Sequence, residues 1–222
     1  MRVTKKSRPT SKAETPDLQS TRNRLLENAD KMFAARGLAG VSVRDLSASV
    51  GIANSSLLYY FPSKKKLYAA VLERIAASIS VIPKHISAQD PPGVVRQLAE
   101  RFLSWNELNP DYAHIVVREL MENPARLEEI HHWYLAAFVH DMRKCIDAAK
   151  ARAGKNNIDT NMLLMIVIGA VTYFSIALPT ISGIDNKADV ASLRRRFLKT
   201  INQAVDATCQ PAADSRRPAS KR

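Results

Sequence analysis

Hydroxyl and amide side chains are concentrated in the segment from Asn54 to Tyr60. Such groups form hydrogen bonds with phosphate oxygens and with base edges, and they carry no charge that must be desolvated. A leucine in the same segment offers an apolar contact to a thymine methyl group. The residues that we expect to contact a nucleic acid here are Asn54, Ser55, Ser56, Leu58, Tyr59 and Tyr60. The alternative is that the two tyrosines pack on a neighbouring helix.

Three further polar side chains extend this predicted contact surface. Arg44 lies in the first turn of one predicted helix and Lys64 at the start of another, so each can reach a phosphate. The backbone N–H groups at the start of the helix near Lys64 add to the attraction for an anion. Ser42 combines two roles, because Ser42-Val43-Arg44-Asp45 has the spacing of a helix N-terminal cap and its hydroxyl can also meet a phosphate.

Hydrophobic periodicity places these residues within a set of four helices. The first carries an apolar stripe and stops at Gly37, and the second is short and is closed by Gly51. The third is the 54–60 segment, and the fourth begins at a Ser63 cap. Two short helices joined by a glycine turn are typical of a helix-turn-helix.

The rest of the chain shows helical patterns with polar breaks and no strand-like alternation. We expect longer helices near 92–108, 110–122, 124–153, 159–181 and 187–208. The predicted fold class is therefore all-α, with an N-terminal three-helix head, a larger helical body and about nine helices. The predicted domains are a disordered basic arm (1–18), a DNA-binding head (19–66), a helical body (67–208) and a disordered basic tail (209–222).

Positive charge is concentrated at the N-terminal end. The formal net charge is +12, and residues 1–66 hold 13 Lys and Arg against 5 Asp and Glu. A phosphate-binding surface requires such a concentration, because each neutralised phosphate releases condensed counterions. The last twelve residues hold 4 Lys and Arg against 1 Asp, and we interpret them as a solvated tail.

The two cysteines, Cys145 and Cys209, are far apart in a chain without a signal-peptide pattern. This spacing fits neither a disulfide framework nor a metal site, and it favours a cytoplasmic, reducing location.

The strings ADKMFAARG (Ala29–Gly37), SVRDL (Ser42–Leu46) and YYFPSK (Tyr59–Lys64) follow one another within residues 20–71. Together with Gly51 and Leu67 they resemble the N-terminal domain of the TetR family of transcriptional regulators. The string LLYYF resembles the RutR-like branch of that family. The resemblance implies a repressor that binds a pseudo-palindromic operator as a dimer and is released by a small-molecule ligand. A ligand-independent activator or architectural DNA-binding protein is the alternative.

The resemblance also implies a ligand pocket in the body. The side chains that we expect to line it are Phe102, Trp105, Ile115, Arg118, Met121, Tyr134, Phe138, Met165, Thr172 and Tyr173. Aromatic and methionine side chains at helical spacing also occur as ordinary core, and this alternative stays open.

The resemblance places a homodimer interface mainly on the last two helices. Residues 162–178 contain 17 uncharged, mostly apolar positions, which approaches the length of a membrane span. We favour burial against a second subunit, because a helix that is apolar all round can also be buried there. Apolar residues at helical spacing form a second stripe, Val190, Leu193, Phe197, Ile201 and Val205. The alternative is that both stripes are core of a single chain.

An enzymatic reading has one weak motif in its favour. Glu128 and His131 have the spacing of a ligand pair in a di-metal helical bundle, but the chain has no second Glu-x-x-His. It also has no nucleophile elbow, no phosphate loop and no CxxC motif. The sequence therefore predicts no catalytic site, no metal and no cofactor.

Overall fold

The computed structural model describes residues 18–122, 133–154, 159–184 and 189–209. Within these ranges the chain forms nine α-helices and one short 3-10 helix, and no strand. The predicted all-α fold is confirmed. Residues 1–17 and 210–222, most of the predicted arm and tail, lie outside the described residues, and Leu18 is already helical.

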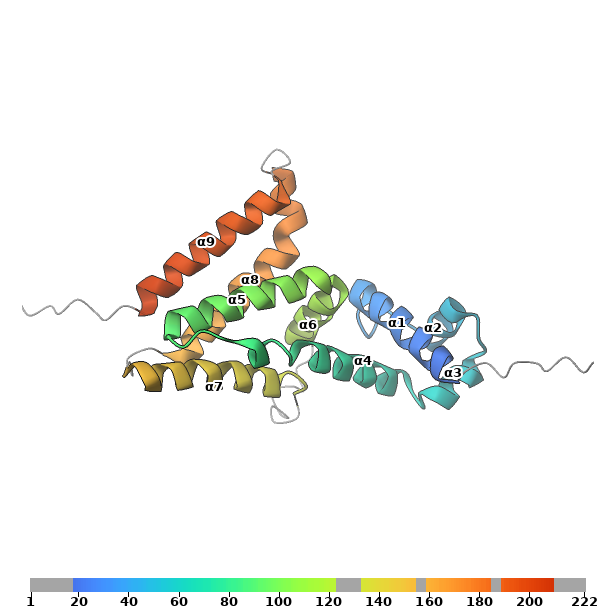
Figure 1. Ribbon diagram of the computed structural model, residues 1–222. Helices are drawn as coiled ribbons and strands as arrows, with labels where there is room; N and C mark the ends of the chain where they lie inside the picture. Colours follow the sequence, from blue (N-terminus) through green and yellow to red (C-terminus); the bar gives the residue numbers. More distant parts are fainter. Residues whose placement is uncertain (1–17, 123–132, 155–158, 185–188, 210–222) are drawn as a thin grey trace, which may run out of the picture.

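The N-terminal end of the molecule is built from four helices (Figure 1). They are α1 (Leu18–Arg36), α2 (Val43–Val50), α3 (Asn54–Tyr60) and α4 (Lys64–Ile79). Their apolar stripes meet in one core, in which Leu25, Leu46, Leu57 and Leu67 are fully buried. Burying one large apolar side chain stabilises the fold by about 1.5–3 kcal/mol. Packing in this core therefore contributes most of the stability of α2 and α3, which are too short to be stable helices on their own.

The other end of the molecule, the body, holds five helices, with α4 running between the two ends (Figure 1). They are α5 (Pro91–Leu108), α6 (Pro110–Glu122), α7 (Ala136–Ala153), α8 (Thr160–Ile184) and α9 (Val190–Cys209), and a 3-10 helix, η1 (Pro83–His85), precedes them. Helix α5 packs against α7, α8 and α9, whereas α6 packs against α1. The contact between α6 and α1 joins the body to the N-terminal helices.

Helix α8 exposes most of its apolar surface. The segment Thr160–Thr180 has a mean hydropathy of 2.2 and is long and apolar enough to cross a membrane, yet only 28% of its most apolar window is buried within the chain. Met162, Met165, Ile166 and Tyr173 lie on its outer side and are 51–73% exposed. One apolar face of the body therefore has no partner within the described residues.

One expectation about the body is wrong. The helix predicted over 124–153 is broken, because Trp133–Leu135 form a turn and α7 starts only at Ala136. Leu135 is buried and the Trp133 ring lies edge-to-face against the Tyr134 ring, so these residues pack in a non-helical conformation. The segment contains no glycine or proline from which this turn could have been predicted. Residues 123–132, with Glu128 and His131, lie outside the described residues.

The apolar stripe on α9 serves the chain's own core. Leu193, Ile201 and Val205 are buried, and Phe197 stacks on Phe174 of α8 with ring centroids 4.1 Å apart. Only Val190, at the start of the helix, is half exposed. The alternative of a core within a single chain therefore holds for this stripe. Among the described helices, α8 keeps a large exposed apolar face.

Candidate nucleic-acid interface

The turn between α2 and α3 is set by local sequence. The Ser42 hydroxyl accepts a hydrogen bond from the Asp45 N–H, and the Asp45 carboxylate accepts one from the Ser42 N–H, which is the predicted capping box. At the other end, Gly51 has a φ of 72°, a left-handed conformation that favours glycine, and its N–H closes α2. These two caps define the length of α2 and therefore where α3 starts.

Helix α3 buries one side and exposes the other. Leu57 is fully buried and Phe61, just after the helix, is 4% exposed. Ser55, Ser56 and Leu58 are exposed, and Tyr59 is 74% exposed. The side that we predicted to contact DNA therefore faces outward, although contact with DNA itself stays a prediction.

Tyr59 and Tyr60 support each other on this exposed side. Their rings meet edge-to-face with centroids 5.5 Å apart, and Tyr60 is half-buried. Tyr60 therefore fits both alternatives, whereas Tyr59 does not pack on a neighbouring helix. The phenol group of Tyr59 extends into solvent, where it can donate to an acceptor outside the chain.

Three predicted contact residues use their side chains within the protein. The Asn54 side-chain oxygen accepts a hydrogen bond from the Ser47 hydroxyl, and the Ser42 hydroxyl is engaged with Asp45. The Lys64 ammonium group donates to the carbonyl oxygens of Leu38 and Val41, each at 2.8 Å. Lys64 is thus turned inward onto the corner between α1 and α2, because carbonyl groups there have no helical donor. We had expected it to reach outward to a phosphate.

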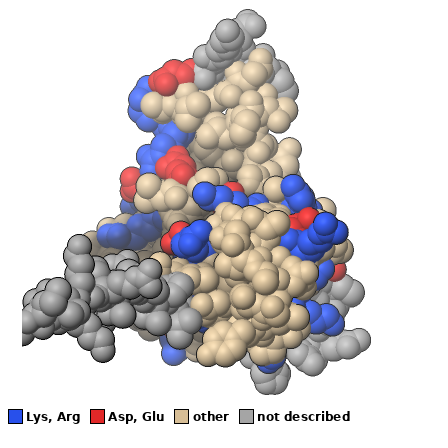
Figure 2. Space-filling view, turned by 90° about the vertical axis from the view of Figure 1, so that its right-hand side faces the viewer, with Lys and Arg blue, Asp and Glu red and all other residues tan. Residues whose placement is uncertain are grey.

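Exposed cations flank the uncharged α3 surface. Arg44, Lys65 and Lys66 are exposed on the helices beside α3. Figure 2 looks onto this end of the molecule and shows Lys and Arg on both sides of a broad uncharged surface, with fewer Asp and Glu. An uncharged hydrogen-bonding centre between cationic flanks matches the division between base contacts and phosphate contacts in DNA recognition.

Two arginines near the start of α1 were not predicted to belong to this site. Arg22 lies over the Phe61 ring at 5.0 Å, and Arg24 donates to the Val50 carbonyl oxygen at 3.1 Å. These contacts fix the end of α2 and the end of α3 against α1. The spacing of the two arginines relative to the apolar stripe of α1 indicates on which side of the helix they lie. It does not indicate which residues of other helices they contact.

The side chains predicted to line a ligand pocket do not all come together. Phe102 contacts Trp105 and Phe138, with ring centroids 6.2 and 5.8 Å apart, and Ile115 is buried in the same core. Tyr134 and Thr172 are half-buried. In contrast, Met121, Met165 and Tyr173 are 67–80% exposed, and Arg118 points toward α1. The exposed residues lie on the outward faces of α6 and α8. Where apolar residues occur on every side of a helix, the sequence does not show which side faces outward.

Five other groups form buried polar contacts that the sequence reasoning missed. Asp30 is paired with Arg74 and accepts a hydrogen bond from Tyr112. Burial and the neighbouring Glu119 carboxyl raise the pKa of Tyr68 well above its usual range. A charged or phenolic residue beside the apolar stripe of a helix was the sequence feature that could have indicated these contacts. Within the described residues, no group of three or more His, Cys, Asp and Glu is placed to hold a metal ion.

Among known proteins, residues 25–71 match the family described as bacterial regulatory proteins, tetR family. The chain is 29% identical over 101 residues to the HTH-type transcriptional repressor NicS of Pseudomonas putida, covering 45% of this chain and 48% of NicS. It is 24% identical over 185 residues to the HTH-type transcriptional regulator RutR of Escherichia coli, covering 82% and 84%. The match to NicS thus spans about half the length of that relative.

A solved structure shares the fold over most of the chain. A bacterial regulatory protein in the tetR family from Rhodococcus RHA1 has a TM-score of 0.67 and 17% identity, covering 86% of this chain and 98% of that structure. Identity this low supports the arrangement of helices and nothing finer. The predicted fold of a helix-turn-helix head on a helical body is confirmed.

Proposed function

Because the chain belongs to the TetR family of transcriptional regulators, we propose that it is a repressor that binds a pseudo-palindromic operator as a homodimer and is released by a small-molecule ligand. The observation that carries this proposal is the exposed, hydroxyl-bearing side of α3, held between cationic flanks at one end of the molecule. In the proposed complex α3 lies in the major groove, with Ser55, Ser56, Leu58 and Tyr59 toward the bases and Arg44 toward a phosphate.

The proposed dimer is supported by a second exposed surface, the apolar outer face of α8. A single head reads only a few base pairs, and two heads must be held about 34 Å apart to enter successive major grooves on one face of the duplex. The apolar outer face of α8 is available to hold them, because Met165, Ile166 and Tyr173 are exposed at helical spacing. Two copies packed through α8, with the outer side of α9 beside it, would cover this face.

Release by a ligand is supported by the way the body contacts the head. Helix α6 packs on α1, so a ligand that favours one position of α6 also favours one position of the head. The buried aromatic cluster of Phe102, Trp105 and Phe138 lies in the same body and is the part of the predicted pocket that remains together.

The experiment is operator selection followed by substitution on the recognition side. An operator is selected from a random duplex library and its affinity is measured by fluorescence anisotropy. Tyr59→Ala and Arg44→Ala should each weaken binding by about 1–3 kcal/mol, and Arg44→Ala should also lower the salt dependence by about one phosphate contact. Arg101→Ala, an exposed arginine on α5, is the matched control and should change neither quantity.

The same experiment distinguishes the alternatives. Failure of the chain to bind duplex DNA at low salt, or full affinity in both Tyr59→Ala and Arg44→Ala, would contradict the proposal. Tight binding without sequence preference favours an architectural protein. Transcription that rises when the protein occupies the operator favours an activator, and partition of the full chain into membranes favours a membrane-attached regulator in which lipid covers α8.

A further inference from the structure

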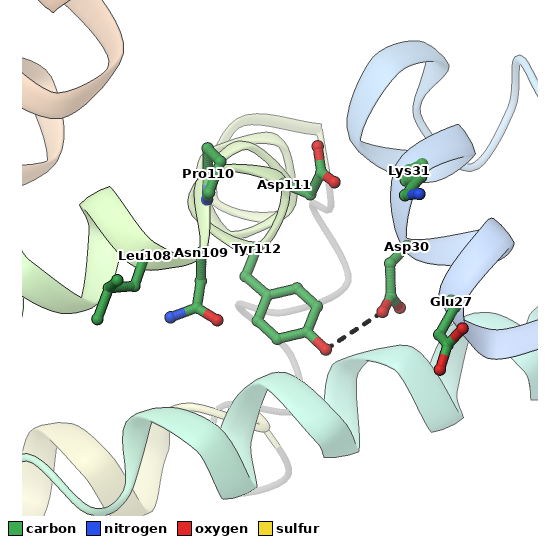
Figure 3. Close-up of a pocket in the computed structure, with 8 residues that line it drawn as sticks. All are labelled: Glu27, Asp30, Lys31, Leu108, Asn109, Pro110, Asp111 and Tyr112. Carbon is green, nitrogen blue, oxygen red and sulfur yellow. Dashed lines mark hydrogen bonds between the residues drawn. The ribbon is translucent and has the colours of Figure 1, made fainter. Parts of the chain in front are cut away.

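A small pocket lies where the head meets the body (Figure 3). It has a volume of about 340 Å³ and is formed by α1 on one side and by the corner between α5 and α6 on the other. Glu27, Asp30 and Lys31 come from α1, and Asp111 and Tyr112 come from α6. It is separate from the exposed side of α3, and it borders the aromatic cluster of the body, because the Tyr112 ring lies 6.3 Å from the Trp105 ring between centroids.

Asp30 is the buried group of this pocket. Its side chain is 9% exposed, and a single carboxylate oxygen, Oδ2, receives both of its described contacts. The Tyr112 hydroxyl donates to that oxygen at 3.2 Å, and Arg74 Nη1 lies 3.3 Å from it. The other oxygen, Oδ1, is buried and has no hydrogen-bond partner among the described residues. Arg74 Nη1 beside it is also buried without a hydrogen-bond partner in the described part of the chain. A buried carboxylate oxygen without a donor is unfavourable, so a donor that reaches Oδ1 would stabilise this carboxylate.

Charge in and around the pocket is unbalanced. The carboxylates of Glu27, Asp30 and Asp111 oppose two cations, Lys31 on the rim and Arg74 behind Asp30. Burial raises the pKa of Asp30, and the Asp111 and Glu27 carboxylates raise it further, whereas Arg74 and Tyr112 lower it. The C-terminal end of α5 and the N-terminal end of α6 both lie here, and their dipoles oppose each other. Around the pocket, carboxylates therefore outnumber cations by one.

The remaining walls favour an organic cation over a metal ion. Leu108 on the rim is 81% exposed, which is unusual for a leucine, and it gives the pocket an apolar edge. Tyr112 adds an aromatic ring that can lie beside a cation. No group of acidic residues in the described part of the chain is arranged to hold a metal. Carboxylates beside apolar and aromatic walls match an ammonium or amidinium group carrying a short apolar substituent.

We propose that the pocket between α1 and the α5–α6 corner binds an organic cation, with Asp30 and Asp111 facing its charge and Leu108 facing its apolar group. The occupant contacts the head through α1 and the body through α6, and it therefore favours one relative position of the two. Its role as an effector rests on the proposed function, whereas the binding itself does not.

Binding is tested first without DNA. The full chain is titrated with benzylammonium in a calorimeter, with neutral benzyl alcohol and anionic benzoate as isosteric controls. We expect saturable binding of benzylammonium, and binding of the two controls at least about tenfold weaker, because charge supplies the recognition. Absence of saturable benzylammonium binding up to about 10 mM, or equal binding of benzyl alcohol, would overturn the proposal.

Substitutions then place the site. Asp30→Asn and Asp111→Asn should each weaken benzylammonium binding by about tenfold or more. Asp111 is the safer position, because it does not share the ion pair of Asp30 with Arg74. Glu73→Gln, an exposed carboxyl on α4 outside the pocket, is the matched control and should bind as the parent chain does. Equal loss in Glu73→Gln and Asp111→Asn would mean general electrostatic attraction and would refute a defined site.

The effector role has a separate readout. Operator affinity is measured with and without benzylammonium for the parent chain and for Asp111→Asn. A several-fold shift in the parent chain that is absent in Asp111→Asn supports the role, and no shift in the parent chain refutes it. Failure of the proposed function looks different, because the chain would then not bind the operator even without benzylammonium.

Discussion

At the residue scale, Lys64 is a structural cation at the edge of the proposed DNA-binding surface. Its ammonium group donates to the carbonyl oxygens of Leu38 and Val41, whereas the neighbouring Lys65 is exposed. Hydrogen bonds from a charged donor to part-buried carbonyl groups are stronger than neutral ones. The main role of Lys64 is therefore to stabilise the head, and any contribution to DNA binding is secondary.

Lys64→Met should lower the free energy of unfolding by about 1–2 kcal/mol, because the two carbonyl groups lose their donor while the aliphatic packing is kept. The measurement is chemical unfolding followed by circular dichroism. Lys65→Met on the same helix turn is the control and should leave stability unchanged. Equal stability of the two variants would contradict this structural role and favour the outward contact with a phosphate that the sequence predicts.

Asp45 is a carboxyl on the proposed DNA-binding surface whose pKa is lowered by the cap of α2. Hydrogen bonds from the Ser42 hydroxyl and N–H hold the pKa of Asp45 below its ordinary value of 3.8, although the group is exposed. A carboxyl whose pKa is lowered by folding stabilises the fold fully above that ordinary value, and this contribution is lost as the pH falls through the lowered pKa.

Ser42→Ala should therefore raise the pKa of Asp45 toward 3.8, because both hydrogen bonds belong to the cap and the hydroxyl is removed. Carboxyl NMR titration of the parent chain and the variant measures this directly. Asp147, whose pKa is lowered by Thr160 in the distant α7–α8 region, is the internal reference and should titrate identically in both. An unchanged titration of Asp45 would contradict the capping geometry.

At the scale of helices, α6 holds the C-terminal end of α1. Arg118 on α6 donates to the carbonyl oxygens of Ala34 and Ala35 at 3.2 and 3.3 Å, and it also pairs with Glu122 one turn further on. The last carbonyl groups of a helix have no partner in their own helix, so a cation from α6 satisfies them. This contact ties the body directly to the head.

Arg118→Met should speed hydrogen exchange of the backbone amides around residues 34–41 and lower stability by about 1 kcal/mol, since the end of α1 loses its external donor. Hydrogen exchange with mass spectrometry reads the local effect. Arg143→Met is the matched control, because Arg143 has an equivalent carboxylate partner, Asp147, but only within α7. Equal exchange at residues 34–41 in both variants would show that Arg118 does not hold α1.

At the scale of the whole molecule, we expect the apolar outer face of α8 to determine how the chain assembles. The side chains that would ordinarily be buried in a soluble protein are Met162, Met165, Ile166 and Tyr173, and all are more than half exposed. A contiguous exposed apolar face of this kind marks an interaction surface. In the proposed repressor that surface belongs to the second copy of the chain.

Ile166→Glu should therefore convert a dimer into a monomer and weaken operator binding, because the two heads are then no longer linked. Sedimentation velocity gives the assembly state, and anisotropy gives the affinity. Val81→Glu is the control, since Val81 is similarly exposed near the end of α4 but lies outside α8. A dimer that survives Ile166→Glu would place the interface elsewhere.

Most of the helix boundaries, the Ser42 and Gly51 caps and the outward side of α3 could be predicted from the sequence. These features depend on residues within about one helical turn of each other, so periodicity and capping chemistry are sufficient to predict them. The break before Ala136 escaped this reasoning, because no turn residue marks it.

The contacts that a side chain makes with another helix could not be predicted, because they depend on how the helices pack. This packing turned Lys64 onto the α1–α2 corner, directed the stripe of α9 inward, exposed Met165 and Tyr173, and paired Asp30 with Arg74. A helix that is apolar on every side contains no local signal for the side that will be covered. The choice is made by the shape and charge of segments far away in the chain, which meet only in the folded molecule.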